Sequence, residues 1–554
     1  MSWSYQLLGQ PASVDDNLEM QKGKSAGTWP MRTRLVTRLL LRAILFLLVI
    51  TAAVYLYAAF LAIDSPKARL LKAASGPLSE VTFSNGQDLA SGQRRFVVVI
   101  PADSPNPNLC KLITSAIALG YPSPVVVNWE ETSYKAEGGF WGPYLGKISG
   151  TLEYLDRVTL PDANTGDKLD DDDLVLIVDA YDVWFQLPPN MLLHRYHESN
   201  KRANARLAAQ WGSAGMPMKQ TIVVSAQKRC FPTKKEGSNL HCDALPESDL
   251  PADAYGAKTD TNINDYHTVR PRYMNSGSFM GPAGDMKRYF RRVKERLEKG
   301  LAEDLPFPGD QGIFAEIFGE QEVWRQWRRD FHASPMGDVM PDNEGAAFMQ
   351  RDVEFHVGLD YTQDLFLPTV YEENDGRFIS LNNKSVIEQH SSKLGISPVH
   401  LLGVPKDLVN TYNPLADILP DANWGDMPLY ADFFTAAVPV VLHHNAWKDG
   451  VKKRRIWWWD QTWYFPHLRQ LLELHMKPGK LRPLAKLPAR SGYLEYFAPR
   501  SDAQMRKPRA FNRDTVKTGF TEIELNAVCR YEDETKDSEE HWYNEVFRDN
   551  KGPM

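Results

Sequence analysis

The stretch DDDDLVLIVDAYDVWFQLPP, residues 170–189, carries the strongest fold signal in the chain. Its centre, residues 174–178, is a continuous apolar run, which is typical of a central strand in a parallel sheet that is buried on both faces. Asp179 and Asp182 follow that run, three positions apart. A carboxylate that enters a buried environment costs free energy unless a positive or hydrogen-bonding group meets it. Acids at the carboxyl end of such a strand therefore indicate a functional site.

Strand-like and helix-like segments alternate on both sides of this run. Apolar runs predict strands over 96–102 and 125–127, and helical spacing of apolar residues predicts helices over 109–119 and 146–158. Further segments follow downstream: a strand over 221–226, a short strand and helix over 272–299, a helix from 308, and an apolar stretch over 438–442. The alternation predicts an α/β fold with a parallel sheet and crossover helices. Ligands of such sheets bind beyond the carboxyl ends of the strands, where Asp179 and Asp182 lie.

Length and composition indicate an enzyme-sized globular protein. The chain has 554 residues, of which 43% are hydrophobic and 24% charged, and its net charge is −6. This length predicts more than one domain. The net charge gives no sign of a nucleic-acid partner, which would favour a basic face.

An N-terminal apolar segment predicts a membrane anchor. Residues 43–63 contain no charged side chain, which is enough helix for a hydrocarbon core of about 30 Å. The preceding flank is strongly basic, so the positive-inside rule keeps the short N-terminus in the cytosol. We expect a cytosolic tail (1–34), a transmembrane anchor (35–63), a stem (64–92), a catalytic domain (93–450) and a C-terminal extension packed on or flanking that domain (451–554). The expected location is the Golgi or endoplasmic reticulum membrane, with single-pass type II topology.

The four cysteines are too few for a disulfide scaffold. Cys230 and Cys242 are near enough in sequence to close a short loop in an oxidising compartment, or they stay as two free thiols. The sequon Asn383-Lys384-Ser385 is a candidate glycosylation site.

Two carboxylates on one turn suit a hard divalent cation, which takes oxygen ligands and commonly bridges substrate phosphates. A nucleotide-sugar donor needs such a bridge, because charge develops on its departing diphosphate. Without metal, we expect Asp179 and Asp182 to repel each other and to favour their protonated forms.

Six short motifs resemble, in order, one glycosyltransferase family. They are GKISGTLEYLDRV (146–158), VDAYDV (178–183), VVSAQKRCFP (223–232), MNSGSFMG (274–281), GDQGIF (309–314) and PVVLHHN (439–445). They are similar to motifs in the glycosyltransferase domain of the procollagen lysyl hydroxylases and related collagen glycosyltransferases. The resemblance implies a GT-A-like fold, a Rossmann-like mixed sheet flanked by helices, that uses UDP-sugars and manganese.

The resemblance also implies roles for particular residues. Asp179, Asp182 and His443 become the metal ligands, and an imidazole after an apolar strand independently suits a mixed oxygen and nitrogen site for manganese. Tyr181 becomes the ring that stacks on the uracil. His444 stands where the family has glycine, so either histidine is a candidate ligand.

The remaining roles concern the diphosphate, the sugar and the acceptor. Lys147 can meet the diphosphate as a point charge. The segment 275–277, with side chains of Asn275 and Ser276 and the backbone of Gly277, lies next to the sugar. Asp310 and Gln311 match the sugar and acceptor region, and Asp310 becomes the base if the enzyme inverts. The family has a second acid at the position of Gly309.

These observations predict a metal-dependent hexosyltransferase that moves a sugar from a nucleotide-sugar, UDP-linked by resemblance, to a protein or glycan acceptor. Two alternatives remain open. One is the same fold with another donor, such as GDP-mannose, and the other is a catalytically silent lumenal binding or scaffold protein.

Overall fold

The computed structural model describes residues 89–131, 142–234, 237–333, 351–446, 452–503, 506–511, 520–535 and 537–554. All of them belong to one compact unit, Leu78–Met554, of the two into which the chain divides. The expected tail (1–34), anchor (35–63) and nearly all of the stem (64–92) lie outside the described residues. Within the part of the chain that is described, no helix is long and apolar enough to cross a membrane.

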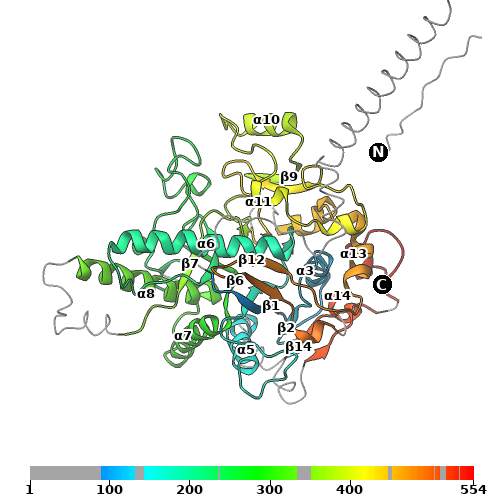
Figure 1. Ribbon diagram of the computed structural model, residues 1–554, viewed down its shortest axis with the longest axis horizontal. Helices are drawn as coiled ribbons and strands as arrows, with labels where there is room; N and C mark the ends of the chain where they lie inside the picture. Colours follow the sequence, from blue (N-terminus) through cyan, green and yellow to red (C-terminus); the bar gives the residue numbers. More distant parts are fainter. Residues whose placement is uncertain are drawn as a thin grey trace, which may run out of the picture. The chain divides into compact units, whose positions relative to one another are not determined.

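A ten-stranded mixed sheet forms the centre of the fold (Figure 1). Its strands are β1 (Gly92–Pro101), β2 (Val125–Val127), β3 (Leu174–Val178), β5 (Ile222–Gln227), β6 (Tyr273–Pro282), β7 (Val357–Asp360), β12 (Ala485–Pro488), β13 (Tyr493–Phe497), β14 (Arg509–Phe511) and β15 (Thr521–Glu522). The main order is β15-β14-β2-β1-β3-β6-β5-β7, with β13 also beside β1 and β12 beside β13.

Two smaller sheets and a set of helices complete the described fold. The small sheets contain β4 (Val183–Phe185), β8 (Phe366–Pro368) and β11 (Val441–His443), and β9 (Gly376–Ser380) and β10 (Pro428–Asp432). The helices include α3 (Pro107–Ala118), α5 (Gly142–Val158), α6 (Pro189–Trp211), α7 (Ala283–Ala302), α8 (Gly309–His332), α10 (Lys384–Lys393), α11 (Lys406–Val409), α12 (Arg454–Trp457), α13 (Leu468–His475), α14 (Leu525–Cys529) and α15 (Trp542–Val546).

Helices cover both faces of the central sheet. Alternate residues of β3 enter two different hydrophobic cores: Leu176 packs on the face that carries α3, and Ile177 on the face that carries α5, α7 and α8. Helices α5 and α7 lie next to each other on that second face (Figure 1). Burial on both faces explains why β3 is apolar at every position, as the sequence predicted.

The sheet is mixed and flanked by helices, as the resemblance implied, and not purely parallel, as the alternation alone predicted. β1 pairs in parallel with β2 and β3, but β6 runs antiparallel to both of its neighbours, β3 and β5. The segment 272–282, expected as a short strand, is a ten-residue strand that lies between them. The observed architecture is therefore a mixed α/β sheet with flanking helices.

Residues beyond 450 contribute strands to the same sheet. The first half of β1 pairs in parallel with β13, and β2 pairs in parallel with β14. The segment 451–554, which we expected to pack on or flank the catalytic domain as an extension, thus supplies part of the central sheet itself.

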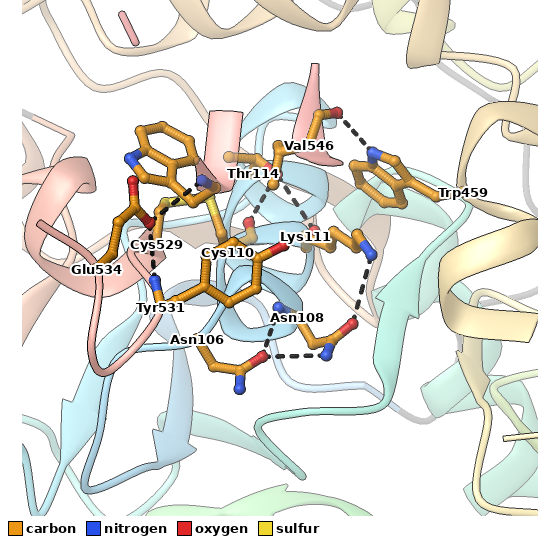
Figure 2. The surroundings of a disulfide bond; sticks show 11 residues. Asn106, Asn108, Cys110, Lys111, Thr114, Trp459, Cys529, Tyr531, Glu534 and Val546 are labelled. Carbon is orange, nitrogen blue, oxygen red and sulfur yellow. Dashed lines mark hydrogen bonds between the residues drawn. A yellow bond between two sulfur atoms is a disulfide. The ribbon is translucent and has the colours of Figure 1, made fainter. Parts of the chain in front are cut away.

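Two disulfides occur among the described residues. Cys230 pairs with Cys242, as the sequence allowed. Cys110 on α3 pairs with Cys529 on α14, a link across most of the described chain that the sequence did not indicate (Figure 2). Beside it, the buried Lys111 forms an ion pair with Glu545 and donates to the carbonyl of Arg455 at 3.1 Å. The disulfide and these polar contacts attach the C-terminal residues to α3.

Candidate metal and phosphate site

The two aspartates lie in the short turn between β3 and β4. β3 belongs to the central sheet, whereas β4 pairs with β11 and so leaves that sheet. A hydrogen bond to β6 fixes the start of the turn. The backbone N–H of Asp179 donates to the carbonyl of Gly277 at 3.0 Å, which continues the antiparallel register of β3 and β6. The change of sheet therefore places Asp179, which is partly exposed, and Asp182, which is buried, beyond the carboxyl end of β3.

The pairing of β4 with β11 brings His443 to the same place. In the antiparallel register His443 lies opposite Val183, the residue that follows Asp182. The backbone N–H of His444 then donates to the carbonyl of Asp182 at 2.7 Å. Strand pairing, and not sequence proximity, thus places an imidazole beside the two acids.

Asp179, Asp182 and His443 form a compact cluster with the geometry of a metal site. The Nε2 atom of His443 lies 3.2 Å from Oδ1 of Asp182 and 3.7 Å from Oδ2 of Asp179. One ligand atom from each residue lies within 4.8 Å of the others. Such spacing lets one cation contact all three atoms.

Each acid turns its other oxygen toward a lysine. Lys147 Nζ lies 2.7 Å from Oδ1 of Asp179, and Lys452 Nζ lies 2.8 Å from Oδ2 of Asp182. Lys147 also lies 2.6 Å from Oδ2 of Asp310 and donates to the carbonyl of Ser276 at 2.8 Å. The oxygens that face Nε2 of His443, Oδ2 of Asp179 and Oδ1 of Asp182, are therefore those that the two lysines do not contact.

The neighbours of Asp182 overturn the expectation that this acid is protonated without metal. Burial alone would raise the pKa of Asp182, but the charges and hydrogen bonds of His443 and Lys452 hold it well below its usual range. Burial alone would lower the pKa of Lys147, yet Asp179 and Asp310 hold it above its usual range. The prediction was wrong for Asp182 because it considered the carboxylates without their cationic neighbours.

The segment 275–277 lies across from the turn, and the first turn of α8 lies beside it. Ser276 Oγ donates to Asp310 Oδ2 at 2.9 Å, so one oxygen of Asp310 faces both a hydroxyl and Lys147. Gln311 donates through Nε2 to the carbonyl of Phe231 at 2.8 Å. Gly309, where the resembling family has an acid, has a φ of +74°, a conformation that favours glycine.

His444 has surroundings unlike those of His443. Its ring packs against Trp184 with centroids 4.2 Å apart, and neither ring nitrogen has a hydrogen-bond partner among the described residues. Burial lowers the pKa of His444 to about 3. Of the two candidate histidines, the structure thus places His443 with the acids and His444 in the core.

Tyr181 lies between the acids in sequence and is anchored by its hydroxyl. The hydroxyl donates toward Asp103 Oδ1 at 3.3 Å and the carbonyl of Ser104 at 3.2 Å, both in the loop after β1. Burial raises the pKa of Tyr181 to about 12, so the phenol stays neutral.

The structure brings nearly all the expected site residues into one contiguous network. Asp179, Asp182, His443, Lys147, Ser276 and Asp310 are connected by direct contacts, and Asn275, Gly277 and Gln311 adjoin them. Sequence reasoning missed Lys452, although a basic run over 452–455 follows the β11 segment and was the available signal. It also missed Gln227, at the end of β5, which accepts from Asn275 Nδ2 at 2.9 Å.

Comparisons with known proteins assign no family to this chain. No family model matches it, and no curated protein matches it. Among solved structures, it is similar to the crystal structure of galactosyltransferase LgtC in complex with donor and acceptor sugar analogs, with 12% sequence identity and a TM-score of 0.23 over 68% of this chain and 95% of that chain. A likeness at this TM-score does not establish a role for any residue of the site.

Proposed function

We propose that the chain is a metal-dependent glycosyltransferase that uses a nucleotide-sugar donor, as the collagen glycosyltransferase resemblance implies. The observation that carries the proposal is the convergence of Asp179, Asp182 and His443 at the carboxyl edge of β3, with a lysine on each acid. The acids and the imidazole suit a divalent cation, and the two lysines suit the negative charge of a diphosphate that such a cation would bridge.

The donor set fits a divalent cation such as manganese. Two carboxylate oxygens and one imidazole nitrogen are hard and borderline ligands of the kind that Mn²⁺ accepts. When bound, the cation would supply positive charge that stabilises the departing diphosphate. Three carboxylates, of Asp179, Asp182 and Asp310, face the two ammonium groups of Lys147 and Lys452. A divalent cation therefore changes the local charge from negative to positive, which favours an anionic diphosphate.

The surrounding residues bind and orient the rest of the donor and the acceptor in this proposal. Lys147 and Lys452 contact phosphate oxygens as point charges. The Tyr181 ring, fixed through its hydroxyl, stacks on the base, uracil in a UDP-sugar. Gln311 and Ser276 contact the sugar, and Asp310 accepts the proton of the acceptor hydroxyl if the reaction inverts.

The proposal includes a cellular location for the catalytic unit. A lumenal catalytic unit of a type II Golgi or endoplasmic reticulum membrane protein agrees with the basic flank and apolar segment near the N-terminus. Two disulfides in the described residues support the same location, because disulfides persist in oxidising compartments. The acceptor would be a protein or a glycan in that compartment.

Donor hydrolysis by the purified protein tests the activity. UDP-sugars and GDP-sugars are each incubated with manganese or with EDTA, and the released nucleoside diphosphate is measured. We expect release from one donor class, dependent on metal and abolished by Asp182→Asn. Asp172→Asn is the matched control, because Asp172 is an exposed acid on the preceding loop.

Release without metal, or equal release by Asp182→Asn, contradicts the metal assignment. No release from any donor favours the binding or scaffold alternative, and release from GDP-sugars alone favours the alternative donor.

A further inference from the structure

Asn275 is buried directly behind His443. Only 2% of its surface is exposed, and its Oδ1 atom lies 3.2 Å from Nδ1 of His443. This nitrogen is on the side of the ring away from Asp179 and Asp182, which face Nε2. Asn275 was expected to contact the sugar, but this contact is with the candidate metal ligand.

Backbone groups determine which atom of the Asn275 amide faces His443. The backbone N–H of Gly277 donates to Oδ1 of Asn275 at 3.1 Å, and an N–H can only donate. The opposite atom, Nδ2, donates to Oε1 of Gln227 at 2.9 Å and to Oε1 of Gln311 at 3.3 Å. The amide therefore has its oxygen toward the histidine.

The two glutamines are themselves oriented by the backbone. Gln227 donates through Nε2 to the carbonyl of Arg229 at 2.7 Å, and Gln311 donates to the carbonyl of Phe231. A carbonyl can only accept, so the oxygens of both glutamines must face Asn275. The backbone N–H of Ser276, 3.4 Å from Oε1 of Gln311, agrees with this orientation. Neither glutamine can exchange its two ends without losing these bonds.

We infer that Asn275 is a positioning residue that keeps hydrogen on Nδ1 of His443, so that Nε2, which faces Asp179 and Asp182, is the ring nitrogen that is left to bind the cation. An oxygen that only accepts requires Nδ1 to donate. The ring is then oriented as a metal ligand before any metal arrives. Partners of this kind, which contact the ligand and not the metal, commonly set metal affinity. This inference rests on the proposed metal site.

Gly277 makes the close approach of the ring possible. A Cβ atom at this position would lie 2.2 Å from Cε1 and 2.3 Å from Nδ1 of His443. Any larger residue must therefore displace the imidazole or the strand. The segment 275–277 therefore positions the His443 ring in two ways. Asn275 accepts a hydrogen bond from Nδ1, and Gly277 has no side chain and so leaves room for the ring.

Manganese affinity of the full chain, measured by electron paramagnetic resonance of free Mn²⁺ without any sugar nucleotide, tests the inference. Asn275→Leu and Asn275→Asp are a matched pair, because both remove the amide N–H donors but only Asp keeps an acceptor for Nδ1. We expect Asn275→Leu to weaken binding by about 10–100-fold and Asn275→Asp to bind within a few-fold of the parent or more tightly. Gly277→Ala should also weaken binding, and Asn200→Leu, at a buried asparagine elsewhere, should not.

The outcomes separate the inference from the proposed function. If the parent binds no manganese, the metal site and this inference both fail. If the parent binds and Asn275→Leu binds equally well, the site stands and the inference is wrong. Equal weakening by the Leu and Asp variants also overturns it, because the acceptor would then not matter. Thermal unfolding of each metal-free variant verifies that it is folded.

Discussion

His443 and His444 are adjacent residues with opposite environments. His443 faces two carboxylates, whereas His444 packs on Trp184 with both ring nitrogens unpartnered among the described residues. We expect His443→Ala to abolish manganese binding and His444→Leu to preserve it. His444→Leu should leave the melting temperature unchanged or higher, because an unpartnered buried polar group costs about 1–3 kcal/mol.

Manganese titration and thermal unfolding of the two variants decide this prediction. If His444→Leu loses manganese binding and His443→Ala keeps it, then His444 is the metal ligand and the assignment of His443 is wrong.

Three buried acids lie outside the candidate metal site. Glu372, Asp375 and Asp432 are buried near Lys228, whose Nζ lies 2.6 Å from Oδ2 of Asp375. Burial raises the pKa of Glu372 well above its usual range and that of Asp432 to about 6. Since Lys228 supplies one positive charge for three carboxyls, the fold favours a protonated acid among them.

The sign of the pH dependence follows from these shifts. The folded protein keeps protons that the unfolded chain releases above roughly pH 4, so this stabilisation is complete below that pH. It is lost as pH rises through about 6 and beyond. Glu372→Gln mimics the protonated acid, so its free energy of unfolding should vary less than the parent's between about pH 5 and pH 8.

Urea unfolding of parent and Glu372→Gln at both pH values measures this difference. Glu388→Gln, at an exposed glutamate on α10, is the control and should follow the parent. If Glu372→Gln loses stability with rising pH as steeply as the parent, the buried acid does not titrate as described.

At the scale of elements, the Cys110–Cys529 disulfide joins α3 to α14 across a sequence separation of 419, whereas Cys230–Cys242 spans 12. A crosslink that closes a longer loop removes more entropy from the unfolded chain. We therefore expect Cys529→Ser to lower stability by about 2–5 kcal/mol, and by more than Cys242→Ser. Denaturant unfolding under non-reducing conditions compares them. Equal stability of Cys529→Ser and the parent would contradict this expectation. It would show that polar contacts such as the Lys111–Glu545 ion pair are enough to hold the C-terminal residues on α3.

The elements that sequence predicted well are those with long apolar signals. β3 was predicted with its observed bounds because residues 174–178 are apolar without interruption, and α3 and α5 were found within a few residues. β4 and β11 are only three residues long, too short for a periodic pattern, yet their pairing creates the site. The direction of β6 was missed because no local pattern encodes it.

The site was predictable where motifs lie next to a strand and less so where contacts are long-range. Asp179 and Asp182 follow β3 directly, so their position could be derived from the sequence. Lys452 reaches Asp182 from a segment without a strong pattern, and the Asn275–His443 contact depends on two separate strand pairings. Such contacts arise from tertiary packing and have no local signal.

For the whole molecule, glycosylation of the sequon at Asn383 reports whether the catalytic unit lies on the lumenal side of the membrane. Asn383 is exposed at the start of α10, where its side chain accepts from the backbone of Val386. If the catalytic unit is lumenal, translation into microsomes should give a glycosylated form that an endoglycosidase shifts and that added protease does not digest. Asn383→Gln should lack the shift, and Asn382→Gln, outside the sequon, should keep it. An unglycosylated, protease-sensitive unit would contradict the orientation.

The claim that Asp179, Asp182 and His443 hold one divalent cation is tested most directly by anomalous diffraction at the manganese edge. Crystals of the protein are grown with Mn²⁺ and UDP, and the anomalous map is calculated for parent and Asp182→Asn. We predict one strong peak in the parent, within roughly 2.6 Å of a carboxylate oxygen of each acid and of Nε2 of His443, and its loss in the variant. A parent map without a peak there, or with its only strong peak at other residues, would contradict the account.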